Sequence, residues 1–136
     1  MHLAYKMNLK AKDINTTALA YIGDAVYEIQ VRKHCLDKVS LNVDKLHSAV
    51  VKFVRAEGQA KAVKKMAAEN FLTEEEMAVY KRARNHKIAS KPKNADPVTY
   101  KTATGFEALL GWLVLDGQKE RLEEGISRAV EIIEEM

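Results

Sequence analysis

The chain has 136 residues, of which 47% are hydrophobic and 30% are charged, a balance typical of one folded domain and unlike that of a disordered chain. Cys35 is the single cysteine, which excludes an internal disulfide and a cysteine-rich zinc site and favours the cytoplasm. The longest apolar run, at residues 108–115, is too short to cross a membrane, and residues 1–13 lack the apolar core of a signal peptide. We therefore expect a cytoplasmic protein in which residues 1–136 form one domain.

The net charge of +3 is unevenly distributed along the chain. Residues 81–101 contain seven Lys or Arg and one acid, whereas residues 116–136 contain seven acids and three bases. The basic segment could attract a polyanion, but a solvated loop followed by a solvated helix would give the same pattern. Charge alone does not decide between these two interpretations.

Apolar residues recur at helical spacing through most of the chain, which predicts an all-α fold with no strand. The chain is expected to begin with a polar lead-in (1–13), followed by a helix capped at one of residues 15–17. A second helix is opened by Asn42 or Asp44 and is bent or broken at Gly58, and a capping box at Thr73 and Glu76 begins the next helix. A basic loop (85–97) then leads to a helix from about 98 to 115 and to a last helix that starts at 117 or 118.

Two predicted helical stretches, Ile14–Tyr27 and Thr102–Leu115, each contain one charged residue, Asp24 in the first and Glu107 in the second. Such depletion of charge is typical of helices buried on most faces. A carboxylate in that setting needs a cation or hydrogen-bond donors to replace its lost hydration, and neither stretch contains a base. The alternative is a structural role, such as capping a helix or pairing with a lysine elsewhere. We predict that Asp24 and Glu107 meet in space and hold a divalent metal ion.

The basic segment that ends at Lys93 leads directly into the helix that carries Glu107. Mg²⁺ prefers oxygen ligands and is commonly held by one or two carboxylates, with waters and substrate phosphates completing its coordination. A phosphate-attracting segment beside two carboxylates favours metal-assisted hydrolysis of a phosphodiester.

Four motifs resemble those of a known enzyme family. Residues 20–28, Ala-Tyr-Ile-Gly-Asp-Ala-Val-Tyr-Glu, resemble the ribonuclease III signature, whose core is an aromatic residue, an aliphatic residue and Gly-Asp-Ala. Residues 104–111, Thr-Gly-Phe-Glu-Ala-Leu-Leu-Gly, resemble the second acidic helix of that family. With Lys-Arg-x-Arg-Asn at 81–85 and Pro-Lys-Asn at 92–94, the chain is similar to the bacterial Mini-ribonuclease III branch over residues 15–135.

This resemblance implies a helical bundle like the endonuclease domain of ribonuclease III. The bundle is expected to work as a homodimer on double-stranded RNA and not to bind a membrane. It implies Mg²⁺ as the cofactor, with Mn²⁺ as a substitute, and products with 5′-phosphate ends. The implied substrate is the precursor of the large-subunit (23S) ribosomal RNA, and a ribosomal protein or a pre-ribosomal particle is a further candidate partner. Typical ribonuclease III enzymes continue into a double-stranded-RNA-binding domain, for which a chain ending at Met136 leaves no room. We therefore expect the basic loop to take over part of the RNA binding.

Carried over to this sequence, the resemblance implies that Asp24 and Glu107 are the catalytic metal ligands. Glu28 and Thr104 are expected to support these ligands without touching the metal, although a surface ion pair with Arg32 would explain Glu28 equally well. The residues expected to bind RNA are Arg82, Arg84, Asn85, Lys87, Lys91 and Lys93. Full-length ribonuclease III enzymes have two further acids, at the positions of Ala20 and Thr104, and these replacements are typical of the Mini branch. Ala83 also replaces an expected glycine.

Two rival functions remain open at this level. The first is a ribonuclease III-like dimer that has weak or no catalysis and binds structured RNA, which the missing acids at positions 20 and 104 favour. The second is a helical DNA-binding regulator, which the basic segment alone suggests and which gives no reason for the two acids. His34, His47 and His86 share no metal-ligand spacing and are expected to be solvated or hydrogen-bonded. The aromatic side chains expected in the core or at a dimer interface are Tyr21, Tyr27, Phe53, Phe106 and Trp112.

Overall fold

A computed structural model describes residues 5–87 and 93–136. Within these residues the chain is all-α, as predicted, with one short 3₁₀ turn, six α-helices and no strand. In chain order the elements are η1 (Ala11–Asp13), α1 (Thr16–Lys38), α2 (Val43–Val54), α3 (Ala56–Ala68), α4 (Glu74–Arg84), α5 (Pro97–Leu115) and α6 (Lys119–Glu134). No helix in the described part of the chain is long and apolar enough to span a membrane.

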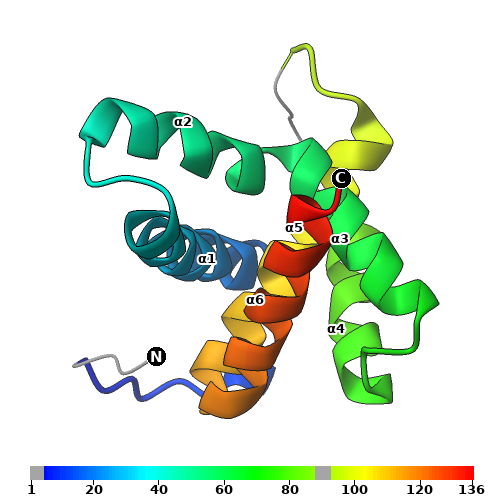
Figure 1. Cartoon of the computed structure of the whole chain (residues 1–136). Helices are drawn as coiled ribbons and strands as arrows, with labels where there is room; N and C mark the ends of the chain where they lie inside the picture. Colours follow the sequence, from blue (N-terminus) through cyan, green and yellow to red (C-terminus); the bar gives the residue numbers. More distant parts are fainter. Residues whose placement is uncertain (1–4, 88–92) are drawn as a thin grey trace.

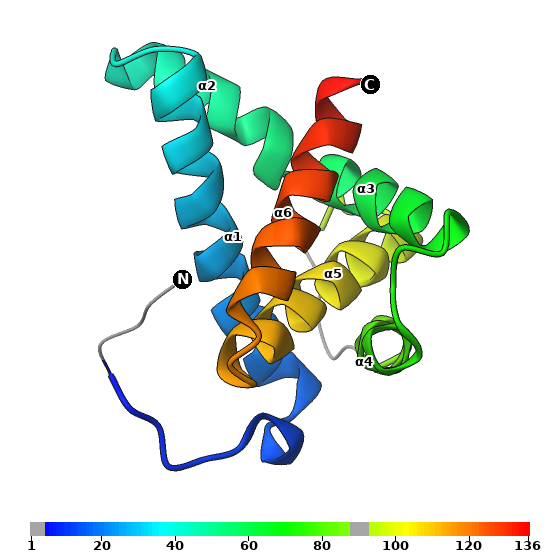
Figure 2. The same ribbon diagram turned by 60° about the horizontal axis from the view of Figure 1, so that its bottom comes forward.

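Helix α5 occupies the centre of the fold. It contacts α1, α3, α4 and α6, and its contact with α1 is the most extensive of these. Figures 1 and 2 show α1 and α2 on one side of α5, α3 and α4 on the other side, and α6 packed across it. In the core, the rings of Tyr27 and Phe106 meet edge to face with their centroids 5.1 Å apart, and both side chains are fully buried. Four of the other helices therefore pack on α5, while α2 packs on α1, α3 and α6.

Polar side chains determine where four of the helices begin. Each of four capping residues accepts a hydrogen bond from a backbone N–H in the first turn of its helix: Asn15, Asn42, Thr73 and Asp96. Glu76 completes the predicted capping box, because its carboxylate accepts a hydrogen bond from the backbone N–H of Thr73 (3.0 Å). These caps agree with the starts that the sequence predicted.

The break near residue 58 was predicted at the wrong position. The chain leaves helical geometry at Arg55, which is extended (φ −71°, ψ 155°) and separates α2 from α3. Gly58 lies inside the first turn of α3, where a Cβ would come within 2.8 Å of the Lys52 carbonyl oxygen. Gly58 therefore allows α3 to pack closely on the end of α2, instead of ending a helix.

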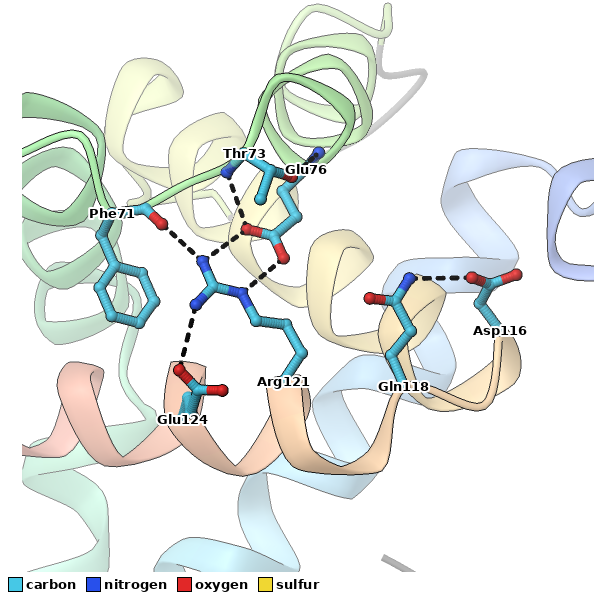
Figure 3. Close-up of polar contacts among 7 residues, drawn as sticks. All are labelled: Phe71, Thr73, Glu76, Asp116, Gln118, Arg121 and Glu124. Carbon is cyan, nitrogen blue, oxygen red and sulfur yellow. Dashed lines mark hydrogen bonds and ion pairs between the residues drawn. The ribbon is translucent and has the colours of Figure 1, made fainter.

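Arg121 on α6 ties α6 to the start of α4 (Figure 3). Its guanidinium donates hydrogen bonds to both carboxylate oxygens of Glu76, at 2.7 and 2.9 Å, and to the backbone carbonyl of Phe71. It also lies over the Phe71 ring, 4.4 Å from the centroid. Burial raises the pKa of Glu76, but hydrogen bonds from Arg121 and Thr73 outweigh burial and hold that pKa below its usual value. This buried ion pair fixes the orientation of α4 against the rest of the bundle.

Two glycines allow α1 and α5 to cross with their backbones in contact. A Cβ at Gly23 of α1 would overlap the backbone carbonyl of Glu107, and a Cβ at Gly111 of α5 would overlap the backbone carbonyl of Leu19. The contact is therefore reciprocal, with the glycine of each helix resting on a carbonyl of the other. Any larger residue would force the helices apart, because neither backbone can move independently of its helix.

We predict that Gly23→Ala lowers the free energy of unfolding by about 3 kcal/mol, because the new methyl group overlaps backbone atoms that cannot relax alone. Chemical denaturation measures the effect. Gly125→Ala on α6 is the matched control, since a Cβ there meets nothing within 4 Å and the change should stabilise the helix by up to about 1 kcal/mol. Equal effects of the two substitutions would contradict the close crossing of α1 and α5.

Candidate active site

A pocket of about 280 Å³ opens where α1 and α5 cross, next to the end of α4. Ten residues line it: Thr16, Thr17, Ala20, Tyr21, Asp24, Ala83, His86, Tyr100, Thr104 and Glu107. Asp24 follows Gly23 directly in sequence, and Glu107 contributes the backbone carbonyl on which Gly23 rests. The close crossing of the helices thus brings the two predicted acids to one pocket, and the predicted convergence is confirmed.

The burial of the two acids differs from the prediction. Glu107 is half-buried, but Asp24 is exposed, although α1 carries no other charge between residues 14 and 27. The neighbouring Tyr21 is also 80% exposed. The charge-depleted face of α1 is therefore partly an uncovered apolar surface, and the expectation that both carboxylates lie in a buried interior was wrong for Asp24.

Of the two acids, Glu107 is the one whose surroundings disfavour its negative charge. Burial raises its pKa most strongly, and the hydrogen bond and the negative charge of Asp24 raise it further, while a hydrogen bond from the Gln59 amide lowers it. The net result is a pKa of about 9 in the metal-free protein. A carboxyl group with these neighbours gives up its proton at neutral pH only if a positive charge replaces it.

The two carboxylates fit a hard divalent cation, because their oxygens converge on one open pocket and the repulsion between them is relieved by a positive charge. Within the described residues no group of three or more His, Cys, Asp or Glu side chains is arranged to hold a metal ion. A cation here would therefore need water or substrate oxygens besides the two carboxylates, which is the usual situation for Mg²⁺.

Comparison with known proteins identifies the family. The family model of the ribonuclease III domain matches residues 17–118. A Mini-ribonuclease 3 from Enterococcus faecalis is 45% identical over 91% of this chain and 94% of its own length, and one from Streptococcus pneumoniae is 44% identical over 89% and 94%. The chain belongs to the Mini-ribonuclease III family. As a member of this family it is an endoribonuclease.

The fold agrees with this membership. A crystal structure of a protein from Fusobacterium nucleatum superposes with a TM-score of 0.78 at 31% identity, and the match covers 90% of this chain and 98% of that one. The helical bundle expected from the sequence resemblance is thus confirmed.

Two positions that carry acids in full-length ribonuclease III enzymes also line the pocket of this Mini-ribonuclease III. Ala20 lies on α1 and Thr104 on α5, and both are in the lining with Asp24 and Glu107. The Thr104 hydroxyl donates a hydrogen bond to the Tyr100 carbonyl (2.9 Å), which leaves its oxygen lone pairs available. Thr104 therefore lies where its expected role, supporting Asp24 and Glu107, requires it to be.

Glu28 does not have that location. It is absent from the pocket lining and forms an ion pair with Arg32, at 3.3 Å, across one turn of α1. Residues four apart on a helix are neighbours, so this ion pair is an alternative to the expected supporting role of Glu28, and that role stays a prediction.

Three of the residues expected to bind RNA, Arg82, Arg84 and Asn85, are sequence neighbours of the lining residues Ala83 and His86 at the end of α4. Arg82, Asn85, Lys87 and Lys93 are exposed, and Lys91 falls outside the described residues. Arg84 already makes two contacts within the chain. Its guanidinium lies over the Tyr80 ring, 5.3 Å from the centroid, and donates a hydrogen bond to the side-chain oxygen of Asn85 (3.1 Å).

Sequence analysis missed four residues that line the pocket or act on Glu107. Thr16, Thr17 and Tyr100 belong to the lining, and no motif marked them as site residues. Gln59 of α3 lowers the pKa of Glu107, and its place in the helical stripe with Val63 and Met66 is a signal that could have identified it. His86 lines the pocket, whereas His34 lies elsewhere and pairs with Glu134 of α6 at 3.0 Å.

We predict that Glu107→Gln stabilises the protein at pH 8 in the presence of a chelator. Because the folded pKa of Glu107 is about 9 and its usual value is near 4.5, the wild type loses stability as the pH rises through that window. Even a quarter of this shift corresponds to about 1.4 kcal/mol. Thermal unfolding in chelator at pH 4 and pH 8 measures the difference, which should vanish at the lower pH.

Glu76→Gln is the control of opposite sign for this prediction. The pKa of Glu76 is lowered, so its ion pair stabilises the fold above the usual pKa and is lost as the pH falls. The substitution should destabilise the protein at pH 8 and have a smaller effect at pH 3. A Glu107→Gln protein that is less stable than the wild type at pH 8 would contradict the raised pKa of Glu107.

Proposed function

We propose that this chain is a divalent-metal-dependent endoribonuclease that cuts double-stranded RNA at the Asp24–Glu107 pocket. The observation that supports the proposal is the convergence of two carboxylates from distant parts of the chain, one of which needs a positive charge to ionise at neutral pH. An unsupported pair of this kind destabilises the fold, which makes a purely structural role unfavourable.

In the proposed reaction, Asp24 and Glu107 hold Mg²⁺, for which Mn²⁺ can substitute. The bound cation supplies Lewis-acid activation of water and neutralises charge at the scissile phosphodiester. The two carboxylates, one from α1 and one from α5, would orient the reacting groups, and the exposed side of Asp24 leaves the pocket open to a backbone phosphate. The products would carry 5′-phosphate and 3′-hydroxyl ends.

The proposal assigns recognition of the duplex to the basic residues at the end of α4 and in the loop before α5. A-form RNA is bound mainly through phosphates and 2′-hydroxyls, so exposed lysines and arginines beside the pocket are suitable contacts. Arg82, Lys87 and Lys93 are exposed there. We extend the proposal to the precursor of large-subunit (23S) ribosomal RNA, in the cytoplasm, on the resemblance of the sequence motifs.

A homodimer is part of the same proposal, because each strand of a duplex then meets its own pocket. Large apolar side chains are exposed along α1 and the turn into α2: Tyr21, Ile29, Leu36, Val39, Leu41 and Val43. A soluble monomer seldom leaves such a run of apolar side chains uncovered. A second copy of the chain would bury this surface.

We predict that Asp24→Asn and Glu107→Gln each reduce kcat for cleavage of duplex RNA in Mg²⁺ by at least about a hundredfold, since each removes a few kcal/mol of charge stabilisation from the transition state. Single-turnover cleavage of an end-labelled duplex measures this. Asp37→Asn is the matched control, because it removes a carboxylate from the same helix outside the pocket and should leave kcat unchanged.

The same assay decides between cleavage and RNA binding without cleavage. The alternative of a weak or inactive RNA-binding dimer has the alanine at position 20 and the threonine at position 104 in its favour. A wild-type protein that binds the duplex but does not cut it in Mg²⁺ or Mn²⁺ would establish that alternative.

We predict that replacing Lys87, Lys91 and Lys93 by glutamine weakens RNA binding and reduces the salt dependence of the association constant. Each lost phosphate contact should lower the slope of log K against log salt by about 0.9 or less. Filter binding between 50 and 200 mM salt measures the slope. Replacing Lys33, Lys38 and Lys119 by glutamine removes the same charge elsewhere, and equal slopes for both triple variants would argue against a specific role of the loop.

A further inference from the structure

The first turn of α1 forms one end of the pocket. Thr16 and Thr17, the first two residues of this helix, line the pocket together with Asp24. Thr17 and Asp24 are seven residues apart, which places them on one face of α1 with about 10 Å between them along the helix axis. The pocket therefore extends from the two carboxylates to the start of α1.

The start of α1 presents hydrogen-bond donors that the chain does not use. Asn15 caps the helix through its side chain, which accepts a hydrogen bond from the Ala18 N–H at 2.9 Å. The backbone N–H groups of Thr16 and Thr17 have no acceptor among the described residues. The first turn of α1 contains no acidic side chain, so its N–H groups keep the partial positive charge of the helix terminus. This end of the pocket therefore favours an anion.

The side chain of Thr16 gives an independent indication of a ligand. Thr16 is 8% exposed, and its hydroxyl has no hydrogen-bond partner among the described residues. The Thr104 hydroxyl in the same lining, by contrast, donates to the Tyr100 carbonyl at 2.9 Å. In the described part of the chain, only Gln59 has an unpartnered side-chain atom that is completely shielded from solvent, so the Thr16 hydroxyl still reaches the open pocket. An unpaired hydroxyl in such a place costs free energy, and an acceptor in the pocket would remove that cost.

The unused groups at the start of α1 can all donate hydrogen bonds, so a matching ligand carries several acceptor oxygens. Threonine hydroxyls, backbone N–H groups and helix N-termini are common contacts of nucleic-acid phosphates. Apart from Asp24 and Glu107, no described lining residue is acidic, and the exposed His86 adds a side chain that can be positively charged. An RNA strand in this pocket would bring one phosphate with each nucleotide.

We propose that the start of α1 is a phosphate-binding subsite, in which Thr16 and Thr17 hold a backbone phosphate of the RNA strand next to the phosphodiester that is cut. The N–H groups and hydroxyls of these two residues donate to its oxygens, while the cation at Asp24 and Glu107 takes the scissile phosphodiester. Two fixed points on one strand align the scissile bond with the cation. This proposal rests on the proposed function, since it takes RNA as the ligand and the two carboxylates as the cutting site.

Thr16→Val tests the proposal, because valine keeps the shape of the side chain and removes the hydroxyl. Single-turnover cleavage of an end-labelled duplex in Mg²⁺ should need about tenfold more protein to reach half of the maximal rate, the usual loss for a hydrogen bond to a charged group. The maximal rate constant should change less than about threefold, since the cation ligands are intact. The melting temperature should not fall, because no hydrogen bond among the described residues is lost. Thr16→Ser keeps the hydroxyl and should stay within about twofold of the wild type.

Thr102→Val is the matched control for this substitution. Thr102 is also buried, but its hydroxyl donates to the Val98 carbonyl at 2.8 Å, and it lies outside the pocket lining. Thr102→Val should therefore lower the melting temperature and leave the half-saturating protein concentration within about twofold of the wild type. A Thr16→Val protein that behaves like this control would overturn the proposal.

A duplex with one neutral linkage tests for direct contact with a phosphate. Methylphosphonates replace the phosphates near the cut site one at a time, and filter binding in a chelator measures affinity without cleavage. At one position the replacement should weaken wild-type binding about tenfold and have little further effect on Thr16→Val. Equal losses in both proteins at every position would show that the Thr16 hydroxyl contacts no phosphate.

Thr17→Val covers the case in which Thr16→Val does not fold, because Thr17 is exposed and its replacement disturbs no packing. Its half-saturating protein concentration should rise at least about threefold, and an unchanged value would contradict the proposal. Failure of the proposed function gives a different result, since Asp24→Asn and Glu107→Gln would then cut at the normal rate. If those two variants are inactive while Thr16→Val and Thr17→Val behave as the wild type, only the phosphate subsite is wrong.

Discussion

The contact between the backbones of α1 and α5 is the constraint on which the pocket depends. Because Gly23 rests on the carbonyl of Glu107, and Gly111 rests on that of Leu19, the two helices are closer than side chains would allow. Contacts of this kind also bring Cα–H groups against carbonyl oxygens, a weak additional attraction. The residues next to the contact must then share one small space, so Asp24 and Glu107 face each other as a consequence of the helix crossing.

The crossing of α1 and α5 does not by itself form the side of the pocket that α4 lines. A separate set of interactions holds α4 in place there. The guanidinium of Arg121 fixes the carboxylate of Glu76, which also caps α4 through Thr73. With its first turn held in this way, α4 packs along α5 with Tyr80 against Gly105, and its last turn brings Ala83 to the pocket. The position of the basic residues that follow Ala83 is thus determined by an ion pair at the other end of the same helix.

The features that the sequence predicted correctly are those with local causes. Helix starts were correct at Thr73 and near Asn15, because a cap and its first turn lie within a few residues. The break at Arg55 was missed, since Arg55 carries no local signal and the role of Gly58 depends on a contact with the end of α2. Gln59 was missed for a related reason: it acts on the pKa of Glu107, which lies 48 residues further along the chain.

The error about Asp24 has a more general cause. Absence of charge along α1 was taken as a sign of burial, but Tyr21 and Ile29 are exposed on the same helix. A surface that is covered in an assembly and a surface that is covered within one chain deplete charge in the same way. Sequence periodicity therefore located the two acids on the correct helices, and it could not determine which of them faced solvent.

The unequal burial of the two acids affects what the pocket can bind. Under the proposed function, a proton and a divalent cation would compete for Glu107 up to a pKa of about 9, so cation affinity should increase as the pH rises. A third carboxylate at Ala20 or Thr104 would add repulsion to a metal-free pair that is already strained. With neither present, the proposed function would take the remaining metal ligands from the phosphate oxygens of the RNA. Cation binding and RNA binding are then thermodynamically linked, and each must strengthen the other by the same factor.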